Sequence, residues 1–231
     1  MNNGEIYTRT FTSSDPITKD KIKAIFTDEL GATVVDHSTS NNIFYVFLGE
    51  DRTCGMEITI EGTDDIMAMP HNDNWNNSHI RYCASTIKMA YARNTNGTIL
   101  FGFSTSSSAD VPLAFAIVQA HHFADDTDKK TIAISIKTDG YTSTDNGVGN
   151  DDVCYGTNHR QSSHSNAVDS TFIEIAKYAI ARYVCDDLFV PVYGGTKTTG
   201  EYNIDGKKYI ATGKTPAQSS YPYTQLFMLC E

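Results

Sequence analysis

Positive charge is scarce in this sequence, and that scarcity argues against a nucleic-acid partner. The chain has 18 Lys and Arg against 28 Asp and Glu, which gives a formal net charge of −10 at pH 7. Its longest basic runs are the pairs Lys129-Lys130 and Lys207-Lys208. Because phosphate backbones are bound by clustered Lys and Arg, we expect no nucleic acid among the partners.

Long apolar runs and paired cysteines are also absent. No stretch approaches the roughly 20 apolar residues that span a bilayer, so we expect no membrane insertion. Residues 1–10 lack the apolar core of a secretion signal, which predicts synthesis in a cytoplasm. The five cysteines are widely spaced and form no CxxC pair. An odd number at such spacing predicts reduced thiols rather than a disulfide framework.

The motifs of common enzymes are missing. The sequence contains no GxSxG, no HExxH and no P-loop, which are the patterns that position a nucleophile, a metal or a phosphate. We therefore predict a non-enzymatic protein without a cofactor. A catalytic pair of Cys154 and His159 stays open as an alternative, because a thiol nucleophile needs a base beside it.

Three clusters have the composition of a metal site. They are His121, His122, Asp125, Asp126 and Asp128; Cys154, His159, His164 and Asp152; and Asp145, Asn146, Gly147, Asp151 and Asp152. Adjacent histidines on a strand point to opposite faces, and the second set matches no zinc spacing. The third has Gly156 where a calcium loop needs a bidentate Glu. We predict solvated surface residues in all three and no metal site.

What the sequence does have is a series of short apolar segments rich in Tyr, Phe, Thr and Ile. Such residues favour strands, and polar or Gly-bearing turns separate the segments. The predicted strands are Glu5–Phe11, Thr33–Val35, Asn42–Leu48, Met56–Glu61, Ile80–Arg93, Thr98–Ser104, Pro112–His121 and Thr131–Thr138. The apolar face of the longest one switches near Ser85, which predicts a β-bulge. Residues 125–130 are expected to form the loop that joins the last two strands.

One helix is predicted near the start. Asp15-Pro16 supplies an N-cap followed by Pro at the first helical position. Ile22, Ile25, Phe26 and Leu30 then follow at helical spacing, and Gly31 ends the run. We expect this apolar stripe to lie on a sheet.

The last third of the chain contains a strong hairpin signal. Asp205-Gly206 stands between Glu201–Ile204 and Lys207–Thr212, and Asp-Gly supplies the positive φ angles of a tight turn. A short apolar strand follows near residue 231. The segment Thr171–Val184 fits a helical face and a strand alternation almost equally, and its β-rich surroundings favour the strand.

These patterns predict a mainly β, antiparallel, sandwich-like fold with one packed N-terminal α-helix. We expect a single β-rich domain over residues 1–231. Residues 139–170 have few large apolar side chains and are predicted to form a long exposed loop. The same loop allows an alternative division into 1–138 and 171–231.

Exposed aromatics among amides are candidates for contact with a protein or a glycan. Trp75, the single Trp, stands between Asn74 and Asn76 in a polar loop, while Tyr141 and Tyr155 lie in the long loop. Such side chains combine stacking surface with hydrogen bonding. The alternative is that Trp75 folds back over the core.

Three segments together resemble structural proteins of tailed-bacteriophage virions, of the tail, baseplate or receptor-binding type. They are residues 80–104, the continuation PLAFAIVQA at 112–120, and the segment from Leu188 that contains the hairpin DGKKY. The resemblance implies a virion protein that is made in the host bacterial cytoplasm and acts by assembly in the tail or baseplate. A collar or a capsid-decorating role is a variant of it.

The resemblance implies that the partners are other virion proteins and copies of the chain itself. We expect edge strands, including the terminal one, to pair across subunits. A receptor-recognition module that binds a cell-surface glycan or a protein is the alternative. A hydrolase or a metal-dependent enzyme is a further alternative.

Overall fold

The computed structural model describes most of the first two thirds of the chain and parts of the last third. The described residues are 1–50, 52, 54–72, 80–105, 111–122, 124–135, 154–155, 171–177, 181–190, 198–204, 206–212 and 227–230. The predicted loop at 139–170 lies outside them except for 154–155, so the division into 1–138 and 171–231 stays a prediction. The described helical residues form two consecutive stretches of six and five residues, so no helix in this part has the length to span a membrane.

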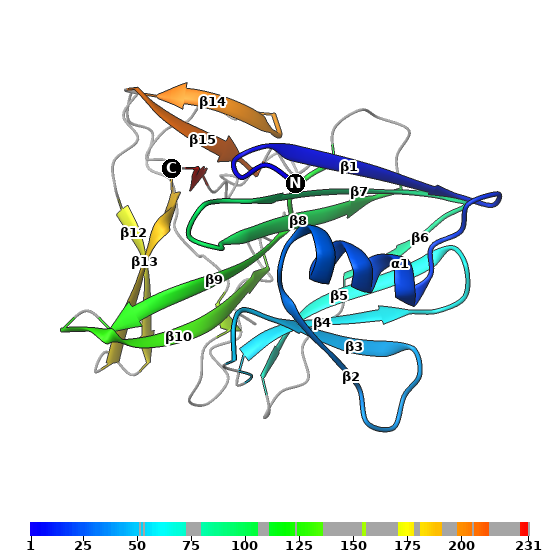
Figure 1. Cartoon of the computed structure of the whole chain (residues 1–231), viewed down its shortest axis with the longest axis horizontal. Helices are drawn as coiled ribbons and strands as arrows, with labels where there is room; N and C mark the ends of the chain where they lie inside the picture. The colour runs from blue at the N-terminus through cyan, green and yellow to red at the C-terminus, as the bar shows by residue number, and fades with distance from the viewer. Residues whose placement is uncertain are drawn as a thin grey trace, which may run out of the picture.

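The described residues form two sheets and one short helical segment (Figure 1). The helical segment consists of α1 (Lys19–Ala24) and a π-helical turn, η1 (Ile25–Glu29). The small sheet has β2 (Thr33–Asp36), β3 (Ile43–Phe47), β4 (Cys54–Ile60), β5 (Asp65–Asn72) and β6 (Ile80–Cys83), in this order. The large sheet contains β1 (Ile6–Thr12), β7 (Thr86–Arg93), β8 (Ile99–Ser104), β9 (Phe115–His122), β10 (Asp125–Ser135), β11 (Cys154–Tyr155), β12 (Thr171–Lys177), β13 (Ala181–Val190), β14 (Gly200–Ile204), β15 (Lys207–Ala211) and β16 (Phe227–Leu229).

The large sheet runs in the order β1-β7-β8-β9-β13-β16-β15-β14. In addition, β10 pairs with β9, β11 with β10, and β12 with β13. Every described pair is antiparallel except β10 with β11. The prediction of a mainly β, antiparallel, sandwich-like protein is therefore confirmed.

The helical segment packs between the two sheets. Phe26 is fully buried, and its ring centroid lies 6.4 Å from that of Phe44 in β3 and 5.1 Å from that of Phe101 in β8. Ile22 and Leu30, from the same apolar stripe, are also fully buried. The predicted packing of this stripe against a sheet is confirmed.

The helix begins later than the sequence predicts. The backbone of Thr12 and Asp15 exchanges two hydrogen bonds of 3.0 and 3.1 Å, so Asp15 closes a turn after β1 instead of capping the helix. Thr18 is the N-cap, and its hydroxyl accepts from the Lys21 N–H at 3.3 Å. Gly31, with φ of 64°, follows the last turn, as predicted.

The prediction of one long strand over Ile80–Arg93 is wrong. β6 belongs to the small sheet and β7 to the large one, and the chain crosses between them at Ala84 and Ser85. The apolar face switches because the chain changes sheets, not because of a bulge. The small sheet also contains β5, a strand that was not predicted.

The prediction that residues 125–130 form a loop is also wrong. They begin β10, which pairs with β9 from Asp125 opposite His122. A register shift between Asp125 and Lys129 accommodates the polar run in the ladder. Polar residues are compatible with this position because both Asp125 and Lys129 are exposed.

Two strand predictions in the last third of the chain are confirmed. Strands β12 and β13 occupy most of the ambiguous segment at 171–184, and β14 and β15 form the predicted hairpin, with Gly206 at φ of 80°. The final apolar strand, β16, is present but pairs with β13 on one side and β15 on the other. The expectation that it offers a free edge is therefore wrong.

Candidate functional site

The large sheet has a break where β8, β9, β13 and β16 meet. Strand β9 pairs with β8 at residues 115–117 and with β13 at residues 121–122. Strand β13 pairs with β9 at residues 183–184 and with β16 at residues 188–189. Residues 118–120 of β9 and 185–187 of β13 lie between these pairings, so a space opens beside them.

The turn between β7 and β8 lies against this break and is built around Asn94. Asn94 is fully buried, and its Oδ1 accepts from the backbone N–H groups of Asn96 and Thr98 at 3.1 and 2.8 Å. Its Nδ2 donates to the carbonyl oxygen of Leu229 at 2.9 Å. Gly97, with φ of 91°, supplies the positive angle that the turn requires. The side chain of Asn94 thus fixes the turn against β16.

The fixed turn holds a buried carboxylate. Asp187 in β13 is only 6% exposed. Its Oδ1 accepts from Asn96 Nδ2 and its Oδ2 from Thr98 Oγ1, each at 2.7 Å. A buried carboxylate is expensive unless it is hydrogen-bonded, and here two neutral donors serve it. Each oxygen retains capacity to accept a further bond.

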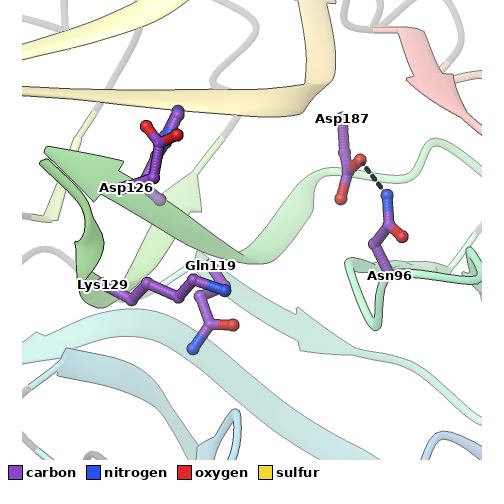
Figure 2. Close-up of a pocket in the computed structure, with 7 residues that line it drawn as sticks. Asn96, Gln119, Asp126, Lys129 and Asp187 are labelled. Carbon is purple, nitrogen blue, oxygen red and sulfur yellow. Dashed lines mark hydrogen bonds and ion pairs between the residues drawn. The ribbon is translucent and has the colours of Figure 1, made fainter. Parts of the chain in front are cut away.

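A pocket of about 360 Å³ occupies the break. Its described lining residues come from the turn and from β9, β10 and β13; they are Asn96, Gln119, Ala120, His121, Asp126, Lys129 and Asp187. Figure 2 shows Asp187 joined to Asn96 at the right and Asp126 at the upper left, with Lys129 and Gln119 below Asp126 in this view. Of these described lining residues, Ala120 alone lacks a polar side chain.

The histidine and acidic cluster predicted from the sequence contributes to this pocket in part. His121 and Asp126 both line it, and His121 Nδ1 lies 3.2 Å from Asp126 Oδ1. Asp125 instead accepts from the N–H and hydroxyl of Thr127 at 3.0 and 2.6 Å. Among the described residues, no three His, Cys, Asp or Glu side chains come together as metal ligands.

The predicted contact residues are not brought to this pocket by anything the structure describes. Trp75, Asn74, Asn76 and Tyr141 lie outside the described residues, as do His159, His164 and the Asp residues at 145, 151 and 152. Tyr155 and Cys154 form the backbone of β11 beside β10. Whether Trp75 contacts a partner therefore stays a prediction.

Among the described lining residues of the pocket, sequence reasoning singled out only His121 and Asp126. It missed Asn96, Gln119, Lys129 and Asp187. A turn was expected between the predicted strands that end at Arg93 and begin at Thr98, and the structure has it, but nothing in the sequence places Asp187 beside it. The separation of 91 positions between Asn96 and Asp187 can only be bridged by the fold. The one local signal was Asn94 itself, since Asn caps its own turn through its side chain.

A second feature of interest is the outer edge of β1, which among the described strands pairs only with β7. The N–H of Ile6 donates to Glu201 Oε1 at 3.3 Å, and that of Thr12 donates to Asp15 at 3.0 Å, so both point away from β7. Antiparallel ladders alternate, so the backbone groups of Thr8 and Thr10 point the same way. Both residues are exposed.

Comparison with known protein families, with curated proteins and with solved structures found no match to this chain. The fold and site together define a two-sheet β protein with a polar pocket at a break in its larger sheet and an open strand edge at β1.

Proposed function

We propose that this chain is a non-enzymatic structural protein of a tailed-bacteriophage virion and acts by assembly in the tail or baseplate. A collar or capsid-decorating position is compatible with the same role. Its partners would be copies of itself and other virion proteins. The resemblance of residues 80–104, 112–120 and the segment from Leu188 onward motivates the assignment.

The observation that best supports assembly is the free edge of β1. Exposed edges with outward backbone groups accept a strand from another chain. In β1 these groups belong to Thr8 and Thr10, and β-branched residues suit strand pairing. The edge is bounded by Glu201 at Ile6 and by Asp15 at Thr12, so it presents a short, defined stretch.

Native mass spectrometry of the purified chain over a range of concentrations tests this proposal. We expect a defined oligomer or reversible higher assembly. In a Thr8→Pro/Thr10→Pro variant the outward N–H groups are lost, while the inward bonds to β7 stay intact because edge strands tolerate Pro on their solvent side. This variant should be monomeric with an unchanged far-UV circular dichroism spectrum.

A Thr8→Val/Thr10→Val variant is the matched control, because it alters the same side chains and keeps both N–H groups. It should assemble as the wild type does. A wild-type chain that stays monomeric at every concentration would contradict assembly with copies of itself. Assembly of the proline variant would show that β1 is not the edge in use.

A further inference from the structure

We propose that the pocket between β9, β10, β13 and the 94–97 turn binds a neutral, hydroxyl-rich ligand, namely a carbohydrate ring. This inference does not rest on the virion role. It follows from the chemistry of the lining, its charge balance, its size and the way its walls are held.

The polar side chains of the lining argue against an apolar ligand. Six of the seven described lining residues have polar side chains, whereas pockets for apolar molecules are lined mainly by hydrophobic groups. Gln119 and Asn96 carry amides that both donate and accept, Lys129 donates, and the carboxylates of Asp126 and Asp187 accept. A ligand whose groups each donate and accept, as sugar hydroxyls do, satisfies such a mixture.

The charges around the pocket favour a neutral ligand. Asp126 and Asp187 oppose an anion, as does the net charge of −10 of the whole chain. Lys129 in the same lining offsets one of these two carboxylates and so weakens the attraction for a cation. A neutral polyol is not repelled and can hydrogen-bond to both kinds of charged group, and such bonds are stronger than those between neutral partners.

The pocket is preorganised on one side and open on the other. Asp187 is 94% buried, and Asn96 and Thr98 hold both of its oxygens. Asn94 in turn fixes Asn96 and Thr98 through their backbone N–H groups. Gln119, Asp126 and Lys129 are exposed, so they leave a path for entry. The volume of about 360 Å³ lies at the small end of ligand pockets, which suits a mono- or disaccharide.

Titration of ¹⁵N-labelled protein with single sugars, followed by two-dimensional NMR, tests the proposal. The neutral probes are D-glucose, D-galactose, D-mannose, L-rhamnose and N-acetyl-D-glucosamine; D-glucuronate and D-glucosamine are the charged comparisons. We expect at least one neutral probe to shift the backbone amides of Asn96, Gln119 and Asp187 in a saturable way. For so small a ligand the dissociation constant should be on the order of 1 mM.

Substitutions at the exposed part of the lining then separate a site from non-specific effects. A Gln119→Met/Lys129→Met variant removes two polar groups from exposed positions and should fold normally. It should weaken sugar binding about tenfold or more, since it loses a hydrogen bond from a charged donor. Lys207→Met is the matched control: it removes an exposed Lys that does not line the pocket and should leave the dissociation constant unchanged.

Three results would overturn the proposal. The first is that no neutral probe moves these amides at about ten times the expected dissociation constant. The second is that the double variant binds as well as the Lys207→Met control. The third is that D-glucuronate or D-glucosamine binds more tightly than every neutral probe. None of these results bears on assembly, which native mass spectrometry reads separately.

Discussion

At the scale of single residues, Gly102 is the described glycine at which the structure leaves least room for an added Cβ. The chain at residues 112–114 crosses β8 there, and a Cβ on Gly102 would collide with the carbonyl oxygen of Pro112 and lie 2.8 Å from the backbone nitrogen of Ala114. A backbone neighbour cannot rotate away as a side chain can. Gly102→Ala should therefore lower the free energy of unfolding by about 2–3 kcal/mol, measured by urea unfolding with far-UV circular dichroism.

Gly200→Ala is the matched control for this prediction. Gly200 also lies in a strand and does not have a positive φ, but the nearest atom to an added Cβ is a ring carbon of Tyr202 at 3.5 Å, an ordinary contact. Its free energy of unfolding should change by less than about 0.5 kcal/mol. Equal losses in the two variants would show that β-strand propensity, not the crossing at Gly102, sets the cost.

The residues of the candidate site show which of its features local sequence could predict and which it could not. The turn at Asn94 to Gly97 was predictable because Asn and Gly have conformational preferences of their own. The partners of that turn were not, because Asp187 and Leu229 are distant in the chain and meet it only through the order of the strands. A hydrogen-bond donor in a turn gives no sign of which distant acceptor it will find.

At the scale of elements, β1 supports a prediction about hydrogen exchange. Tyr7, Arg9 and Phe11 form the hydrogen-bonded pairs with β7, since the amides of Ile6 and Thr12 point outward. In the dissociated subunit the amides of Arg9 and Phe11 should exchange slowly, and those of Thr8 and Thr10 rapidly. NMR-detected exchange checks this alternation.

Hydrogen exchange of β1 measured at high protein concentration tests whether this strand takes part in the proposed assembly. If a second chain pairs with β1, the amides of Thr8 and Thr10 should become protected while those of Arg9 and Phe11 change little. Exposed backbone groups on an edge acquire partners only when another strand is added. Uniform protection of all four amides in the dilute subunit would contradict the open edge.

The strands also show where the apolar periodicity of the sequence predicts an element correctly and where it does not. The position and type of most elements were predictable, because alternation and turn residues act locally. The crossing at Ala84 and Ser85 was misread, since a change of face produces the same apolar pattern whether a strand bulges or passes to another sheet. Residues 125–130 were misread because charged residues on an exposed strand end resemble those of a loop.

At the scale of the whole molecule, two tyrosines link stability to alkaline pH: Tyr91 in the core and Tyr82, which is partly buried against it. Tyr91 is 1% exposed and donates to Glu29 Oε2 at 2.6 Å; burial, then this hydrogen bond, raises the pKa of Tyr91 to about 12. Burial also raises the pKa of Tyr82, whose ring lies 5.5 Å from that of Phe103. The unfolded chain loses these phenolic protons near pH 10, before the folded chain does.

The sign of the effect follows from proton linkage. Below about pH 10 both states hold these protons, so the contribution to stability is fully present. Between about pH 10 and 12 the folded state binds more protons than the unfolded state, so the free energy of unfolding falls as pH rises. Urea unfolding at several pH values from 8 to 12 should show this decline.

Substitution assigns the decline to these two side chains. Tyr82→Phe/Tyr91→Phe should flatten the dependence between about pH 10 and 12, although loss of the bond to Glu29 lowers stability at pH 8 by about 1–2 kcal/mol. Phe103→Leu is the control, because it destabilises the same core and keeps both phenols; it should retain the wild-type slope. If the double Phe variant declines as steeply as the wild type, other groups govern alkaline unfolding. A flattened slope would instead show that these two phenols account for most of the decline, as their raised pKa values require.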